Sequence, residues 1–301
     1  MAFPYLSDFV NAAFGTQWSL PLPTFGLLVL AAILLSARLA RLEAARKESA
    51  GILPPHSQAI VGDLAVVSAL AGLLGARLFH ILDHWAQFVA DPAAMLLSRG
   101  GFSIYGGVCF GVIAGMILLR RRRIPIPPML DVVAPAMMLG YAIGRIGCQL
   151  AGDGDWGVAA DLALKPDWLP DWLWAQTYDG NILGVAMAPP GVYPTPIYES
   201  GIALAACGAL WIMRSHAHRP GYLFSVYLLL AGFERLLIEK IRINVDHSVF
   251  GATLTQAEAI SLVVICAGLA GVLFTLRGRR VVAKLTLVLG VIAALSACAP
   301  F

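Results

Sequence analysis

Apolar residues run almost uninterrupted through seven stretches of the chain. These stretches cover residues 22–40, 59–82, 102–119, 129–150, 197–213, 222–242 and 257–276, and a shorter apolar run covers 285–297. A transmembrane helix needs roughly 20 mostly apolar residues. The pattern therefore predicts an all-α polytopic membrane protein with seven transmembrane helices and a short eighth apolar segment at the C-terminus.

Two segments predict structure outside the bilayer. Residues 1–19 lack a basic region but place apolar side chains at helical spacing, which indicates a helix in the membrane interface rather than a signal peptide. Residues 151–196 are rich in Trp, Pro, Gly and Asp, too polar to span and too long for a turn, which predicts a small extracytoplasmic cap. We expect one membrane domain over 1–280, followed by a hydrophobic segment over 281–301.

Basic residues gather on one side of the predicted spans. Fourteen of the 21 Lys and Arg follow the first, third, fifth or seventh span, whereas only Arg99 and Lys165 lie in the opposite loops. Loops rich in Lys and Arg stay in the cytoplasm, so the N-terminus and the cap are expected outside.

The composition agrees with a membrane protein and excludes several other classes. Hydrophobic residues make up 59% of the chain and charged residues 13%, and the mean hydropathy is +0.77. A soluble domain carries roughly 25% charged residues, so a water-soluble enzyme is excluded. The net charge of +3 gives no indication of nucleic-acid binding. The cysteines and histidines form no ligand motif, and we expect neither a metal nor a cofactor.

Several charged residues nevertheless fall within or at the ends of the spans. They are Arg77, Arg145, Glu199, Glu234, Arg235, Glu239, Lys240 and Arg242. A charge at the bilayer centre costs at least about 2.5–3.5 kcal/mol, so such groups pair with one another or line a wet cavity. The spacing of Arg235, Glu239 and Arg242 places all three on one helix face.

Two interpretations of these charges remain open at this point. They form either a buried ion-pair network that joins helices or a phospholipid site, because a guanidinium group grips phosphate with two hydrogen bonds. Gly144 and Gly147 flank Arg145 in the sequence GRIG, where they allow close helix packing or leave room beside a bound lipid.

At the GRIG motif and on both sides of it, the sequence resembles the prolipoprotein diacylglyceryl transferases. The similarity extends from about residue 20 to 277, and its motifs occur in the family's order. They are GARLFHILDHWAQFVADP (75–92), the GG near 106, RRRRIPIPPMLDVVAP (120–135), GRIG (144–147), YPTPIYE (193–199), FERLLIEKIR (233–242) and TLTQ (253–256). The resemblance implies transfer of a diacylglyceryl group from phosphatidylglycerol to the lipobox cysteine of a preprolipoprotein, with release of glycerol phosphate. It places this reaction at the outer, periplasmic face of the bacterial inner membrane.

The resemblance also implies roles for individual residues. Arg145 and Arg235 would hold the phosphate, with Glu199 and Glu239 orienting them. The implied substrate-binding residues are Arg77, Gly144, Gly147, Cys148, Asp153, Asp155 and Arg242.

The sequence departs from the family's pattern at five places. Tyr105 stands in place of a histidine, Cys148 in place of an asparagine, and AGDGDWG (151–157) in place of an NGELWG-type segment. Phe25 and Ala231 each stand in place of a tyrosine. We expect Tyr105 to take part in catalysis. The other candidates for removing the thiol proton are Asp153, Asp155, His80 and His84.

These departures leave several alternatives open. Asp153 and Asp155 fit either a polar turn, which we favour, or a divalent-cation site. Cys148 is either a packing residue, which we favour, or a lipid-carrying thiol. For the protein as a whole, we expect the diacylglyceryl transferase activity. The alternatives are a phospholipid-dependent transferase with another acceptor and a non-catalytic membrane protein that binds phospholipid or lipoprotein signals.

The C-terminus combines the parts of a lipoprotein signal peptide. A basic stretch, a 13-residue apolar run over 285–297 and the sequence LSAC ending at Cys298 follow one another. The predicted orientation carries Cys298 to the outer face. This tail is either a self-acceptor for the transferase or a short eighth helix with a chance LSAC.

Overall fold

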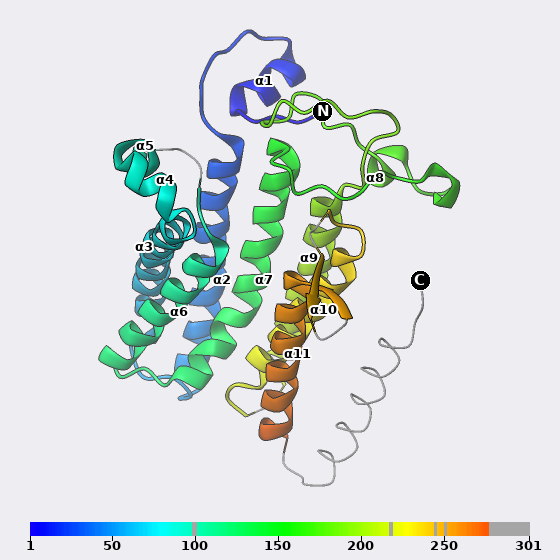
Figure 1. Cartoon of the computed structure of the whole chain (residues 1–301). Helices are drawn as coiled ribbons and strands as arrows, with labels where there is room; N and C mark the ends of the chain where they lie inside the picture. Colours follow the sequence, from blue (N-terminus) through cyan, green and yellow to red (C-terminus); the bar gives the residue numbers. More distant parts are fainter. Residues whose placement is uncertain (98–100, 217–218, 244–245, 250–251, 277–301) are drawn as a thin grey trace. The chain divides into compact units, whose positions relative to one another are not determined.

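The computed structural model describes residues 1–276 except 98–100, 217–218, 244–245 and 250–251. Helices dominate these residues, and the predicted all-α membrane class is confirmed (Figure 1). The apolar run over 285–297 and Cys298 lie outside the described residues, so the eighth segment stays a prediction.

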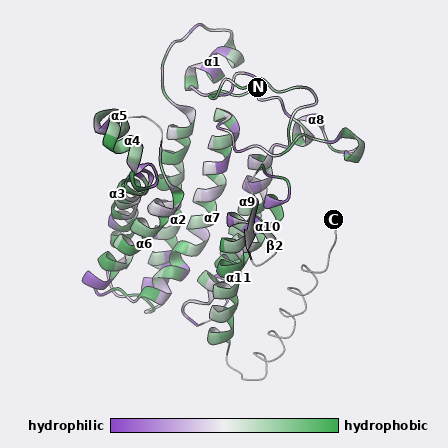
Figure 2. Cartoon of the chain, in the orientation of Figure 1, coloured by the Kyte–Doolittle hydropathy of each residue, from purple (hydrophilic) through white to green (hydrophobic). Residues whose placement is uncertain are grey.

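Within the part of the chain that the structure describes, six helices are long and apolar enough to cross a membrane. They are α2 (Thr24–Ser49), α3 (Ser57–Asp83), α6 (Ile104–Arg121), α7 (Ile126–Ala151), α9 (Thr195–Met213) and α11 (Gln256–Thr275). Apolar positions dominate them (Figure 2), and large side chains such as Leu74 and Val263 are exposed on their surfaces. Such faces suit lipid, so the protein is a multi-pass membrane protein.

The predicted span over 222–242 forms helix α10 (Tyr222–Glu239) but is not among these six. Its 18 residues include Glu234, Arg235 and Glu239, which lower its apolar character. The count of seven spans therefore stays a prediction.

The described chain forms two compact units, and the boundary between them falls within α2 and α7. The unit of residues 30–140 contains α3, the short helices α4 (Trp85–Ala90) and α5 (Pro92–Leu97), and α6. Helices α3 and α6 approach closely at Gly75 and Gly106, where a Cβ on either glycine would overlap the carbonyl of the other. Buried residues of α2, α3, α6 and α7 form its core, including Ala44, Val61 and Val132.

The other unit comprises residues 1–29 and 141–301. It contains α1 (Leu6–Phe14), η1 (Leu162–Leu164), α8 (Asp171–Trp174), α9, α10 and α11, with α10 packed against both α9 and α11. Helix α1 agrees with the helix expected within residues 1–19. Strands β1 (Asp246–Val249) and β2 (Ala252–Thr255) form a hairpin before α11, which the sequence did not predict.

The segment over 151–196 folds mainly through isolated backbone bridges rather than long helices. Gln176 and Val192 exchange both backbone hydrogen bonds at 3.0 Å. The chain start is fastened to this segment by bonds from the backbone N–H of Ala2 to the carbonyl of Asp179 (2.7 Å) and of Phe3 to that of Leu150 (2.5 Å). The cap is therefore an ordered part of its unit.

Candidate active site

Six charged side chains from five segments of one unit converge on a single cluster, which we call the arginine–carboxylate cluster. Its members are Arg145 of α7, Asp155 of the cap, Glu199 of α9, Arg235 and Glu239 of α10, and Arg242 just beyond α10. All six were predicted site residues. The structure brings together residues that lie up to 97 positions apart in the chain, as the interval from Arg145 to Arg242 shows.

Glu199 lies at the centre of the cluster. Its side chain is fully buried and forms an ion pair with Arg145. Its Oε1 also lies 3.3 Å from Nη1 of Arg242 and 3.7 Å from Nη1 of Arg235. One carboxylate thus faces all three guanidinium groups, which suits the predicted orienting role.

Asp155 brings the cap into the cluster. Its carboxylate pairs with Arg145, and its Oδ1 lies 2.6 Å from Nη2 of Arg242. Burial raises the pKa of the Asp155 carboxyl, but the two guanidinium groups outweigh this effect and hold the pKa below its usual value. Asp155 is therefore ionised at neutral pH and occupies a position where two arginines bind one anion.

Arg235 of α10 is held by Glu239 of the same helix. Arg235 lies 2.9 Å from Oε2 of Glu239, one helical turn later, as the spacing predicted. The hydroxyl of Thr255, at the end of β2, donates to Glu239. Thr255 belongs to the TLTQ motif, but its side-chain partner could not be read from sequence.

A close backbone contact between the cap and the residue before Arg242 fixes the position of Arg242. The backbone N–H of Val158 donates to the carbonyl of Ile241 at 2.9 Å. A Cβ at Gly157 would overlap that same carbonyl, so the glycine lets the cap reach the chain next to Arg242. On the other side of Asp155, the hydroxyl of Thr195 donates to the Asp155 carbonyl at 2.6 Å.

The cluster is balanced in charge, with three guanidinium groups and three carboxylates. Its accessible face is formed by Asp155 and Arg235, whose side chains are 34% and 29% exposed, whereas Arg145 and Arg242 are more deeply buried. The buried Nε of Arg242 has no hydrogen-bond partner among the described residues. An oxyanion that reached this face would find guanidinium donors already in place.

The other predicted site residues of α7, which are Gly144, Gly147 and Cys148, lie beside the cluster. A Cβ added at Gly144 would have no neighbouring atom within 4 Å. A Cβ added at Gly147 would lie 3.1 Å from the ring of Phe25. Gly147 therefore serves close packing, and Gly144 leaves open space. Cys148 is buried, and its Sγ accepts a hydrogen bond from Arg145 at 3.6 Å.

Asp153 completes a possible ligand group with Cys148 and Asp155, whose donor atoms all lie within 4.8 Å of one another. Two observations favour the polar turn instead. Gly152 and Gly154 on either side of Asp153 have φ angles of +62° and +101°, typical of a tight turn. The Asp155 carboxylate already faces two cationic groups, which would repel a metal ion.

Four other predicted residues lie in the unit of residues 30–140. Arg77 donates to the backbone carbonyls of Gly101, at 2.9 Å, and Met95. Tyr105 is an exposed residue in the first turn of α6, and the rings of His80 and His84 stack with centroids 4.4 Å apart. The roles predicted for all four stay predictions.

Comparison with known proteins identifies the relatives of this chain. The family described as prolipoprotein diacylglyceryl transferase matches residues 12–274. A phosphatidylglycerol–prolipoprotein diacylglyceryl transferase of Synechococcus elongatus is 30% identical over 257 residues, which cover 83% of this chain and 82% of that protein. Its namesake in Leptospira interrogans is 28% identical over 268 residues, covering 80% and 77%.

Proposed function

The chain belongs to the prolipoprotein diacylglyceryl transferase family and transfers a diacylglyceryl group from phosphatidylglycerol to prolipoprotein, and we propose that the arginine–carboxylate cluster binds the phosphate during this transfer. The convergence of three arginines on the buried Glu199 is the observation that carries the proposal. A cluster that only joined helices would not need an accessible guanidinium face.

The transfer replaces a carbon–oxygen bond of the lipid by a carbon–sulfur bond to the acceptor. The acceptor sulfur forms a bond to the carbon of the diacylated glycerol that carries the phosphate. The bond from that carbon to the phosphate oxygen breaks. The electron pair of the broken bond stays with the departing glycerol phosphate, while the thiol gives up its proton. Negative charge therefore grows on the phosphate in the transition state, where preorganised guanidinium groups stabilise it most effectively.

Arg145 and Arg235 hold the phosphate in this proposal, and Arg242 supports them. Arg235 lies at the accessible face, and Arg145 is fixed by Glu199 and Asp155. Glu199 and Glu239 orient the guanidinium groups. Tyr105 remains the proposed group for the thiol proton, because it occupies the position of the family's histidine.

We also propose the bacterial inner membrane as the location, with the reaction at its periplasmic face. The concentration of Lys and Arg in the loops on one side supports this orientation. The cluster includes Asp155 from the cap, which lies in one of the loops on the opposite side.

A reconstituted assay tests the proposed function. Purified protein in vesicles of phosphatidylglycerol is given a peptide with a lipobox cysteine, and mass spectrometry follows both products. We expect equal amounts of the diacylglyceryl thioether and glycerol phosphate. Glycerol phosphate without the thioether would indicate hydrolysis or another acceptor, and would contradict the proposal.

Cys298 gives a second proposal, which concerns the chain's own tail. The apolar run over 285–297 followed by LSAC supports the idea that Cys298 is itself an acceptor. We expect the membrane-extracted protein to carry one diacylglyceryl group, which Cys298→Ser removes. An unmodified Cys298 in protein that is active toward peptide would contradict self-modification without affecting the main function.

A further inference from the structure

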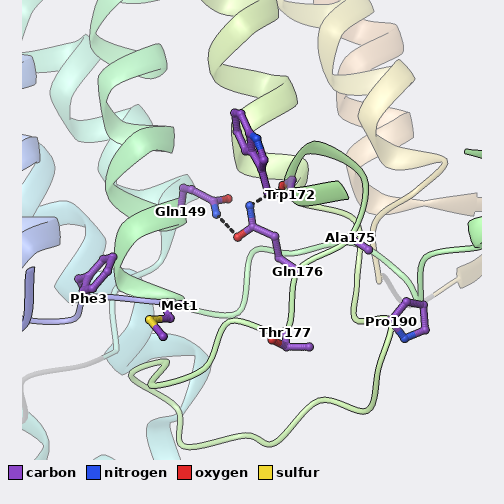
Figure 3. Close-up of a pocket in the computed structure, with 8 residues that line it drawn as sticks. All are labelled: Met1, Phe3, Gln149, Trp172, Ala175, Gln176, Thr177 and Pro190. Carbon is purple, nitrogen blue, oxygen red and sulfur yellow. Dashed lines mark hydrogen bonds between the residues drawn. The ribbon is translucent and has the colours of Figure 1, made fainter. Parts of the chain in front are cut away.

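A pocket in the cap lies apart from the side chains assigned to the reaction. Its volume is about 580 Å³. It is lined by Met1, Phe3, Gln149, Trp172, Ala175, Gln176, Thr177 and Pro190 (Figure 3). The lining comes from the chain start, the end of α7 and the cap, all within one unit. A volume in this range suits a ligand far larger than a glycerol headgroup.

The side chains that line this pocket are polar or apolar but uncharged, and the one charged group in the lining is the amino group of Met1. Nε2 of Gln149 donates to Oε1 of Gln176 at 2.8 Å, and Nε2 of Gln176 donates to the Trp172 carbonyl at 2.7 Å (Figure 3). The hydroxyl of Tyr178 donates to Oε1 of Gln149 at 2.6 Å, which fixes the first amide. Amides and aromatic rings, with no Lys or Arg side chain among the lining residues, suit a ligand that carries its own amide groups.

Thr177 also offers its backbone groups at the edge of an extended segment. Gln176 uses its backbone N–H and carbonyl to pair with Val192. Because backbone groups alternate in direction along an extended chain, those of Thr177 point away from Val192. Ala175, Gln176 and Thr177 all line the pocket. The backbone N–H of Ala175 already donates to the carbonyl of Asp171 at 2.9 Å, so a further extended chain would pair by strand addition with the backbone of Thr177.

The pocket and the arginine–carboxylate cluster share one helix. Gln149 follows Arg145 by four residues on α7, which is roughly 6 Å along the helix axis. Cys148 lies between them and contacts Arg145. A polypeptide in the pocket would therefore reach the cluster within a few residues.

We propose that this pocket binds the acceptor polypeptide, in extended conformation, next to the cysteine that receives the diacylglyceryl group. The inference rests on the proposed function. It assigns the amide-lined pocket to the peptide and the arginine–carboxylate cluster to the lipid phosphate. The occupant is the part of the acceptor that lies beyond the ends of the membrane helices, since the pocket is built from the cap.

Trp172→Ala tests the pocket, with Trp168→Ala as its matched control. Both tryptophans lie in the cap and are exposed, at 58% and 81%, but only Trp172 lines the pocket. In the transfer assay, we expect Trp172→Ala to raise the KM for the acceptor peptide by about tenfold. The kcat and the KM for phosphatidylglycerol should not change, and Trp168→Ala should behave as the wild type.

A binding measurement separates this inference from the activity. A fluorescent peptide with serine in place of the acceptor cysteine should bind the wild type about tenfold more tightly than Trp172→Ala. Methylating the peptide amides on one edge should weaken binding, whereas methylating those on the other edge should not. Equal peptide affinity in the wild type and Trp172→Ala would overturn the pocket assignment. If the wild type transfers no lipid at all, the proposed function fails instead.

Discussion

Replacing Arg145 by alanine should lower the rate of diacylglyceryl transfer by about 10²–10³-fold, the cost typical of removing one donor that stabilises a developing oxyanion. Arg145 is buried between Glu199 and Asp155 and is proposed to face the phosphate as its charge grows. The loss should appear in kcat, because the interaction strengthens in the transition state. Initial rates in phosphatidylglycerol vesicles measure it.

Two further variants make the Arg145 result interpretable. Arg145→Lys keeps the positive charge but loses the planar fork, so its rate should lie between those of the wild type and Arg145→Ala. Arg122→Ala removes an exposed arginine whose partner is the equally exposed Asp63, and it should leave the rate unchanged. Full activity in Arg145→Ala would remove this residue from the phosphate site.

Replacing Glu199 by glutamine should destabilise the protein by about 3–5 kcal/mol, which is the usual cost of breaking a buried ion pair by removing one partner. Glu199 is fully buried and faces Arg145, Arg235 and Arg242. The substitution keeps the shape but leaves three guanidinium groups with two carboxylates. Thermal unfolding in detergent should show a lower melting temperature, and transfer should fall as the arginines lose their orientation.

Glu239→Gln provides the comparison for Glu199→Gln. Glu239 pairs with Arg235 and accepts a hydrogen bond from Thr255, so its loss affects one arginine rather than three. We expect a smaller drop in melting temperature. If the two variants are equally stable, Glu199 is not the centre of the cluster.

The charge balance of the cluster has a consequence for lipid binding. A phosphate that enters adds a negative charge to a neutral group of six side chains. Asp155 is the most exposed of the carboxylates and sits between two arginines. In the proposed mechanism the phosphate shares or takes over the guanidinium donors that Asp155 occupies.

Some of this site could be predicted from the sequence because charges are rare in apolar spans. The separation of Arg235 and Glu239 by four residues placed them on one helix face, and the structure shows the ion pair. The GRIG motif identified Arg145. A charge within the bilayer is costly, so these residues were expected to pair with one another or to line a wet cavity.

Other contacts of the site depend on the path of the cap. The cap has no periodic pattern of apolar residues from which its path could be predicted. The pairing of Asp155 with both Arg145 and Arg242 follows from the backbone contact of Val158 with Ile241. Sequence reasoning placed Asp155 in a polar turn with substrate contacts but could not identify its partners. The contact of Thr255 with Glu239 depends on a hairpin that the apolar pattern did not predict.

The helices likewise divide into those that the sequence predicted and those that it did not. Long apolar runs predicted α2, α3, α6, α7, α9 and α11, because a bilayer imposes length and hydrophobicity on each helix. The short helices α4, α5 and α8 carry too few residues for a periodic pattern and were not predicted. Their formation depends on tertiary contacts rather than on propensity.

The most direct test of the central claim is whether the arginine–carboxylate cluster holds phosphatidylglycerol. Native mass spectrometry of the protein released from detergent would compare lipid retention in the wild type, Arg145→Ala and the surface control Arg122→Ala. We predict that the wild type and Arg122→Ala retain phosphatidylglycerol and that Arg145→Ala loses it. Undiminished retention by a folded but inactive Arg145→Ala would contradict a phosphate site in this cluster.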